Sequence, residues 1–232
     1  MKILALDTAT ENCSVALLID GQLTARERLL ERGHAECILP MIDEVLAAAG
    51  TALAGLTAIA FGRGPGSFTG VRLAASVTQG LAHGAGIPVV PVSDLAAVAQ
   101  RVLGDAATAE RVLVCNDARM REVYWGCFVR SPDGLAAALS EERVSNPRDV
   151  ALPADWTAGP GLHGAGTGFA AYPELRSTFA AVLGRISDVG PRAADIARLA
   201  VPDVVAGRLR TPEEALPVYL RNEVAHPPPG GH

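Results

Sequence analysis

The chain has 232 residues, of which 49% are hydrophobic and 19% charged, and its formal net charge is -5. This composition is that of a folded protein with one large or two small domains, and it excludes a disordered chain. The acidic charge also argues against independent binding to the phosphate backbone of a nucleic acid.

Neither a signal peptide nor a membrane span is predicted. The first apolar run reaches an acid at Asp7, and no stretch approaches the roughly 20 apolar residues of a spanning helix. The cysteines lie far apart and form no CxxC pair; they are Cys13, Cys37, Cys115 and Cys127. They predict reduced, packed thiols rather than a disulfide or metal framework, and therefore a cytoplasmic protein.

The first hundred residues predict three strands followed by alternating helices and strands. The apolar runs 2–7 and 13–20 form a hairpin, and a third strand, 22–30, follows the turn signal Asp20-Gly21. From His34 to Gly50 apolar residues recur at helical spacing, and Pro40 predicts a kink or a late start. The later elements are a strand at 56–62, a helix at 68–81, a strand at 87–92 and a helix at 93–103 capped by Ser93.

A weak internal repeat begins at Arg111. Residues 112–135 align with residues 3–23 as an apolar strand, an aspartate near its end, a polar turn, a second strand and a turn of the Asp-Gly type. Two short helices are predicted near 172–184 and 190–206, and the tail 223–232 is expected to be disordered. The α/β pattern thus predicts an N-terminal lobe at 1–105 and a C-terminal lobe at 106–222, each a mixed sheet with helices against it.

The segment FGRGPGSFTGVRLAAS, residues 61–76, places a glycine-rich loop between a strand and a helix. Such a loop can bind an anion through backbone N–H groups and the helix dipole, or can simply form a tight turn. Ser67 is the expected N-cap, and the small residues Gly70, Ala74, Ala75 and Gly80 would allow another backbone to approach the helix. A Walker site is excluded because Val71, rather than lysine, follows Gly70.

The remaining polar residues predict no catalytic site. The histidines form neither HExxH nor an i, i+4 pair; they are His34, His83, His163, His226 and His232. Asp7 and Asp117 occupy matching strand ends in the two halves, where they could hold a metal across a cleft or cap turns. Capping is the simpler interpretation, and no nucleophile–base pair is visible.

Four segments together resemble the TsaB/YeaZ family, the bacterial non-catalytic subunits of the tRNA threonylcarbamoyladenosine-forming system. They are ILALDTAT…SVALL, HAECILP, GPGSFTGVRLA and DARMREVYW, and the resemblance runs from Ile3 to the YLR at 219–221. It implies two ribonuclease-H-like lobes of the actin/sugar-kinase/Hsp70 type, with a five-stranded sheet in each. It also implies no catalysis by this chain and no resident cofactor, with a nucleotide conceivable only in the assembled complex.

The resemblance further implies a set of partners. The catalytic paralogue, of the TsaD family, transfers threonylcarbamoyl from threonylcarbamoyl-AMP to the adenosine beside the anticodon of tRNAs reading A-starting codons. That paralogue binds a metal through an HxxxH pair, at whose positions this chain has Asp94 and Val98, so no metal is expected here. A TsaE-type ATPase is implied as a transient partner, tRNA as an indirect one, and a homodimer in the paralogue's absence.

The implied partner surface consists of the helices at about 34–49 and 67–84. The expected contact residues are His34, Ile38, Leu39, Ile42, Leu46, Phe68, Val71, Arg72 and Ala75. The loop residues Asp7, Gly64, Gly66, Ser67, Thr69 and Gly70 are interpreted as a vestigial phosphate site with a structural role. Two other hypotheses are a phosphotransferase of the same superfold that uses Asp7 and this loop, and a metallopeptidase.

Overall fold

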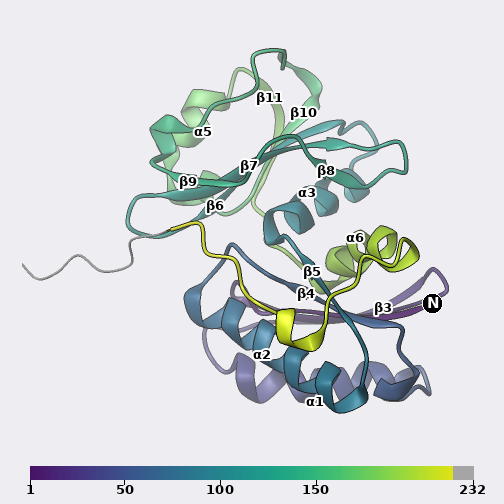
Figure 1. Cartoon of the computed structure of the whole chain (residues 1–232). Helices are drawn as coiled ribbons and strands as arrows, with labels where there is room; N and C mark the ends of the chain where they lie inside the picture. The colour runs from purple at the N-terminus through teal and green to yellow at the C-terminus, as the bar shows by residue number, and fades with distance from the viewer. Residues whose placement is uncertain (222–232) are drawn as a thin grey trace, which may run out of the picture.

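The computed structural model describes residues 1–221; the predicted tail 223–232 lies outside the described residues. Eleven strands and six α-helices form two sheets with helices packed on them (Figure 1). The elements of the first half are β1 (Lys2–Asp7), β2 (Asn12–Ile19), β3 (Gln22–Leu29), α1 (His34–Ala48), β4 (Ala58–Gly62), α2 (Phe68–Ala85), β5 (Val89–Val92) and α3 (Asp94–Asp105). Those of the second are β6 (Arg111–Asp117), β7 (Val123–Arg130), β8 (Ala136–Ala138), β9 (Arg143–Ser145), β10 (Gly159–Ala165), α4 (Gly168–Ala171), α5 (Pro173–Phe179), β11 (Leu183–Ser187) and α6 (Ala193–Val205).

The first sheet has the strand order β3-β2-β1-β4-β5, with β2 antiparallel to its neighbours and β4 and β5 parallel to β1. Asp20 and Gly21 turn the second hairpin with φ of 47° and 87°, as the Asp-Gly signal predicts. Because side chains alternate along β1, Leu4 and Leu6 pack against α1 and α2, whereas Ile3 and Ala5 face the opposite side.

Helix α1 begins at His34 rather than late, and Pro40 lies inside it. Its buried residues recur at the predicted spacing; they are Ile38, Met41, Ile42, Val45 and Leu46. Ser67 and Ser93 cap α2 and α3 as expected, because their hydroxyls accept from the backbone N–H of Gly70 and Ala96, both at 3.1 Å.

The second sheet repeats the first. Its order β8-β7-β6-β10-β11 has the same pattern of antiparallel and parallel pairs, with β9 added beside β7. In both hairpins an aspartate is the last paired residue of the first strand, opposite Ser14 for Asp7 and Val123 for Asp117. The fold is therefore the predicted pair of ribonuclease-H-like lobes, and the weak sequence repeat is a structural duplication.

The second lobe departs from the predicted elements in one region. Residues 159–165 form β10, a central strand for which the sequence predicts no element. The predicted helix near 172–184 is too long, because α5 ends at Phe179 and residues 183–187 form β11.

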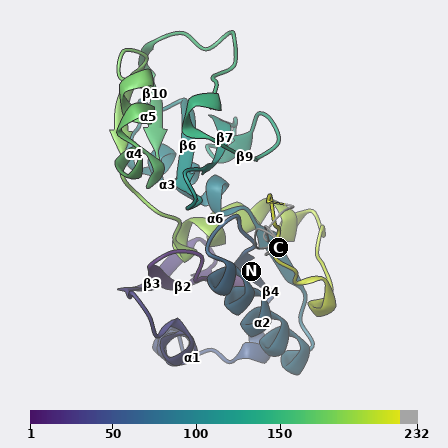
Figure 2. The same ribbon diagram turned by 90° about the vertical axis from the view of Figure 1, so that its left-hand side faces the viewer.

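Helices α3 and α6 lie between the two sheets (Figures 1 and 2). Helix α3 belongs to the first half of the chain, yet its side chains Val98 and Val102 pack against Val112 and Phe128 of the second lobe. Helix α6 comes late in the chain, yet its Ile196 packs on the first sheet. The expected division at residue 105 therefore does not describe the packing of either helix, because each covers the sheet of the other half.

The thiols of the cysteines are free, and three of them are buried in the cores. Burial raises the pKa of Cys13 and of Cys127 to about 11. Within residues 1–221, no helix is both long and apolar enough to cross a membrane.

Candidate functional site: a filled glycine loop and the outer face of α2

One side of the glycine loop between β4 and α2 packs against this chain's own backbone. A Cβ on Gly66 would lie 2.6 Å from Cβ of Ala9, and a Cβ on Gly70 would lie 2.0 Å from the carbonyl oxygen of Thr8. Both partners belong to the turn between β1 and β2. The glycines are therefore required for close packing of two loops, and the turn occupies the space beside them.

Hydrogen bonds fix the same contact. The Ser67 N–H donates to the Ala9 carbonyl at 2.8 Å, and the Thr8 hydroxyl donates to the Gly70 carbonyl at 2.7 Å. The Ser67 hydroxyl is already used as the cap of α2. Thr69 is exposed and points to no shared site with these groups. These bonds join the glycine loop and the start of α2 to the turn after β1.

Asp7 and Asp94 form a buried carboxyl pair behind the loop. An Asp7 oxygen accepts from the Ala9 N–H at 2.9 Å, and an Asp94 oxygen accepts from the Gly64 N–H. Both side chains are fully buried, and a Cβ on Gly62 would touch both carboxyls, at 2.7 Å and 2.4 Å. Burial, and then the adjacent Asp7, hold the pKa of Asp94 well above its ordinary value, and burial also raises the pKa of Asp7.

The charge on one carboxyl disfavours ionisation of the other in this buried site, which favours a proton shared by the pair. Asp7 is therefore sealed from solvent and from any substrate in this conformation. The phosphotransferase hypothesis needs Asp7, which the structure buries, although the loop residues Pro65, Gly66 and Ser67 line the cleft between the lobes.

Asp117 is the counterpart of Asp7 in the second lobe. It accepts from the Arg119 N–H at 2.8 Å, just as Asp7 accepts from the residue two positions on, and it also accepts from the Tyr172 hydroxyl at 2.8 Å. Burial and this bond raise the pKa of Tyr172 to about 12. Both aspartates therefore cap the turns that follow their strands, which confirms the simpler of the two interpretations.

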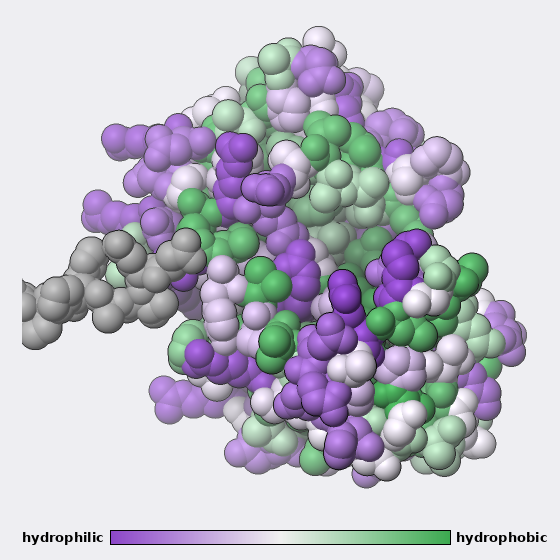
Figure 3. All heavy atoms as spheres, in the orientation of Figure 1, coloured by the Kyte–Doolittle hydropathy of each residue, from purple (hydrophilic) through white to green (hydrophobic). Residues whose placement is uncertain are grey.

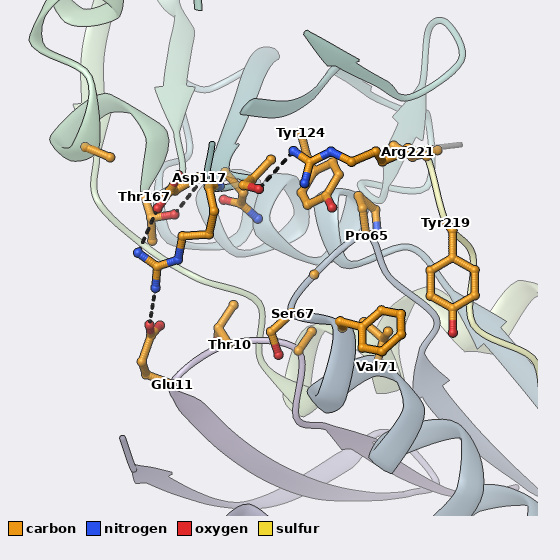
Figure 4. A pocket seen from close by; sticks show the side chains of 18 of the residues that line it. Thr10, Glu11, Pro65, Ser67, Val71, Asp117, Tyr124, Thr167, Tyr219 and Arg221 are labelled. Carbon is orange, nitrogen blue, oxygen red and sulfur yellow. Dashed lines mark hydrogen bonds and ion pairs between the residues drawn. The ribbon is translucent and has the colours of Figure 1, made fainter. Parts of the chain in front are cut away.

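A cleft of about 800 Å³ separates the lobes (Figure 4). Arg119 spans it, with its guanidinium 3.1 Å from Asp117 and 3.5 Å from Glu11 of the first lobe. The lining also includes Glu31 and Asp188, so carboxylates outnumber the arginines, Arg119 and Arg221. This charge opposes a polyphosphate ligand.

Metal-ligating side chains do not gather in the part of the chain that the structure describes: no group of three His, Cys, Asp or Glu could hold an ion there. Asp94 belongs to the buried carboxyl pair, and Val98 packs in the apolar cluster between α3 and the second sheet. The His34 ring lies 2.9 Å from the Thr10 carbonyl, and the His163 ring lies 2.9 Å from the Pro160 carbonyl.

The expected partner residues divide into two groups. Ile38, Ile42, Leu46, Val71 and Ala75 are buried in the core of the first lobe, so the expectation that they contact a partner is wrong. The helical periodicity marks these side chains as one face, and that face covers the sheet. Leu39, Phe68 and Arg72 are exposed, the first two by 47% and 52%, and His34 is half-buried.

Phe68 and Arg72 belong to an exposed cluster that the sequence analysis did not recognise as a unit. The Arg72 guanidinium stacks 3.3 Å from the Phe68 ring centre, and its Nε donates to the Tyr219 hydroxyl at 2.7 Å. Tyr219 is 45% exposed, and the exposed Leu216 lies beside it at a groove of about 370 Å³ next to α2. We call Phe68, Arg72, Leu216 and Tyr219 the aromatic patch. On the face in Figure 3, apolar residues reach the surface among polar ones where the lobes meet.

The outer face of α2 continues from this patch with small residues. Ser76, Gly80 and Gly84 are spaced four apart, so they lie on one side of the helix. A Cβ on Gly80 or Gly84 would meet no atom within 4 Å. Glycine inside a helix costs about 1 kcal/mol relative to alanine, and no packing within the described chain requires it at these two positions.

Comparison with known proteins gives consistent matches along almost the whole chain. The sequence profile of the family described as "TsaD: tRNA N6-adenosine threonylcarbamoyltransferase" matches residues 28–165. The tRNA threonylcarbamoyladenosine biosynthesis protein TsaB of Escherichia coli K12 is 42% identical over 230 residues, covering 97% of this chain and 96% of that protein. The protein of the same name from Haemophilus influenzae is also 42% identical, over 97% of this chain and 95% of its own.

Two solved structures from Pseudomonas aeruginosa superpose closely. One, described as an uncharacterized protein with similarity to peptidase YeaZ, has a TM-score of 0.88 at 45% identity and covers 95% of this chain and 99% of its own. The other, described as YeaZ, has a TM-score of 0.83 at 42% identity and covers 94% and 99%.

Proposed function

Because the chain belongs to the TsaB/YeaZ family, we propose that it is the accessory subunit of a tRNA-modifying complex. In this role it binds a TsaD-type catalytic paralogue, which transfers threonylcarbamoyl from threonylcarbamoyl-AMP to the adenosine beside the anticodon of tRNAs reading A-starting codons. The chain itself carries out no step of the reaction.

The observation that carries this proposal is the outer face of α2. A cluster of aromatic rings and an arginine is typical of an interface core, and the chain exposes such a patch at the start of the helix, where Arg72 stacks on Phe68 and bonds to Tyr219. Gly80 and Gly84 then leave room for a second backbone to approach. The aromatic patch would supply affinity and the two glycines would let the backbones come close, so this face is suited to packing against a helix of another protein.

The family profile supports the choice of partner. A TsaD profile aligns with residues 28–165, which include α2, and this supports a paralogue of the same fold with an equivalent helix. Two related folds can pair through equivalent helices by a pseudo-two-fold axis, and two copies of this chain can pair in the same way. We therefore assign the homodimer to the same face, in competition with the paralogue.

The remaining parts of the proposal extend the family assignment. A TsaE-type ATPase joins the complex transiently. Other subunits hold the tRNA, because this chain is acidic. Any nucleotide binds only to the assembled complex, which acts in the cytoplasm. The test is to mix the purified chain with its paralogue and measure complex formation and threonylcarbamoylation of tRNA. Absence of both a complex and a gain in modification would overturn the proposal.

Replacing Gly80 with leucine is expected to weaken the complex with the paralogue at least tenfold, because the side chain would hold the two helices apart. The monomer should keep its stability, since a Cβ at this position meets nothing. Titration calorimetry gives the affinity, and urea unfolding gives the stability. Gly104→Leu is the matched control, because Gly104 lies in α3 with equally open space; equal affinities for the two variants would contradict the assignment.

Replacing Leu39 with aspartate tests whether α1 shares the interface. Leu39 is exposed on α1, so the variant should fold normally and lose affinity if this face is covered in the complex. Val71→Asp is unsuitable for the same test, because Val71 is only 1% exposed and the charge would unfold the monomer. Unchanged complex formation by Leu39→Asp would restrict the interface to α2.

A further inference from the structure

The last described residues form a strap across both lobes. After α6 the backbone of Arg210 exchanges two hydrogen bonds with Val89 at the edge of the first sheet, both 2.9 Å. The Val218 N–H then donates to the Arg63 carbonyl at 2.7 Å. From there the chain crosses to the second lobe, as the yellow segment of Figure 1 shows. We call residues 208–221 the strap.

Two residues near the end of the strap bind different lobes. Tyr219 lies in the aromatic patch on α2 of the first lobe, where Arg72 donates to its hydroxyl. Arg221 lies on the second lobe, where it donates to the Ala118 carbonyl at 3.2 Å and to the Glu122 carboxylate (Figure 4). Its side chain is only 18% exposed, so it is an anchor rather than a free surface charge.

Arg221 binds the turn between β6 and β7, whose backbone conformation is unusual. Arg119, Met120 and Arg121 have φ of 60°, 54° and 61°, a left-handed conformation that non-glycine residues rarely adopt. Two backbone bonds between Ala118 or Arg119 and Glu122 close the turn, at 2.9 Å and 3.0 Å. Such strained turns persist where surrounding contacts hold them, and Arg221 supplies contacts to both ends of this one.

Two of the segments that carry the family resemblance thus meet in space with the YLR at its end. GSFTGVR supplies Phe68 and Arg72, the DARMRE turn receives the anchor, and YLR connects them. The backbone of Tyr219 is held on both sides: Val218 is bonded to Arg63 of the first lobe, and Arg221, beyond the single residue Leu220, is bonded to the second lobe. The backbone of the strap therefore couples the aromatic patch to the second lobe.

We propose that Arg221 is a positioning residue for partner binding, because it holds Tyr219 in the aromatic patch from the opposite lobe. The inference rests on the proposed function, since the patch is taken as the surface for the catalytic paralogue. If Arg221 has this role, the paralogue recognises the two lobes in one relative position. A change in the width of the cleft between the lobes would then shift Tyr219 through the strap and alter the partner surface.

The test measures the affinity of the full chain for the purified catalytic paralogue. Arg221→Met keeps the aliphatic stem and removes the hydrogen bonds; it should weaken binding about tenfold, and Arg221→Lys should restore part of the loss. Tyr219→Ala should weaken binding to a similar degree. The double variant should bind no more weakly than Tyr219→Ala alone, because each change removes the same feature, the Tyr219 side chain held in the aromatic patch. Arg210→Met is the matched control, since this strap arginine pairs with Glu214 within the first lobe, and it should bind within twofold of wild type.

A second measurement follows the strap directly. Amide hydrogen exchange at Val218 and Tyr219 should become faster in Arg221→Met than in Arg210→Met, while urea unfolding shows a cooperative transition, and therefore a folded chain, for both. This readout needs no partner, so it reports on anchoring alone.

The inference is overturned if Arg221→Met binds within twofold of wild type, or if amide exchange at Val218 and Tyr219 is no faster in Arg221→Met than in Arg210→Met. It is also overturned if the double variant loses the product of the two single losses, since Arg221 would then contact the partner itself. If Gly80→Leu weakens binding and Tyr219→Ala does not, the inference fails while the proposed function stands. If the wild-type chain binds no paralogue, both fail.

Discussion

Gly70→Ala is expected to destabilise the protein by about 3 kcal/mol, although alanine favours a helix by up to about 1 kcal/mol over glycine. The reason is the contact between α2 and the turn after β1. The added methyl would lie 2.0 Å from the Thr8 carbonyl oxygen and 2.6 Å from the Ser67 hydroxyl. It would therefore displace a backbone segment and disturb the cap of α2 together.

Thermal unfolding measures this effect against an internal control on the same helix. For a chain of this size, 3 kcal/mol corresponds to a decrease in Tm of about 6–12 °C. Gly80→Ala makes the same chemical change where no atom lies within 4 Å, and it should raise stability by up to about 1 kcal/mol. Opposite signs for the two variants are the expected result. A stabilising Gly70→Ala would show that the loop has free space, and the vestigial phosphate site would have to be reconsidered.

Asp94→Asn is expected to abolish a large part of the pH dependence of stability. In the wild type, the folded chain retains a proton on the Asp7–Asp94 pair above the pKa of an ordinary aspartate, near 3.9, because the pKa of Asp94 is raised by burial and by Asp7. The unfolded chain has lost that proton. Stability therefore falls as pH rises through this window, by about 1.4 kcal/mol per pH unit, until the raised pKa is passed.

The asparagine side chain reproduces the protonated acid without titrating. Its amide can donate to Asp7, and its carbonyl can accept from the Gly64 N–H, the present partner of Asp94. Urea unfolding between pH 5 and pH 8 should show a flatter profile for Asp94→Asn and a higher stability than wild type at pH 8. Asp117→Asn is the control, since Asp117 is bonded to Tyr172 and Arg119 rather than to a carboxyl. Parallel profiles for wild type and Asp94→Asn would show that the pair holds no proton.

The first lobe was predictable because its signals are local. The Asp20-Gly21 turn, the caps Ser67 and Ser93, and the helical spacing after His34 each need only a few neighbouring residues. Strand β10 has no such signal. Its sequence GPGLHGA contains a proline and three glycines, which favour a loop.

Tertiary packing explains β10. A Cβ on Gly164 would lie 2.7 Å from the Leu183 side chain and 3.1 Å from Phe169. The glycine is therefore needed where large side chains cross a central strand, between β6 and β11. Neither neighbour is close in sequence, so local patterns cannot indicate the strand.

The partner surface was predictable only in part for a related reason. Periodicity places Ile38 and Ile42 on one face of α1, and Leu39 on its flank, but it does not say which face covers the sheet. Phe68 and Arg72 could be assigned to the first turn of α2. Their companion Tyr219 is almost 150 residues away and joins them because the strap returns to the first lobe.

The exchange of α3 and α6 between the lobes has a consequence for how the molecule denatures. If the chain were severed between α3 and β6, the apolar side of α3 would lose its cover from Val112 and Phe128, and the first sheet would lose Ile196 and its neighbours. Each half would then expose a hydrophobic surface to water, and neither would be stable in isolation. The two lobes should therefore melt as one, in a single calorimetric transition, in spite of the duplication visible in their strands.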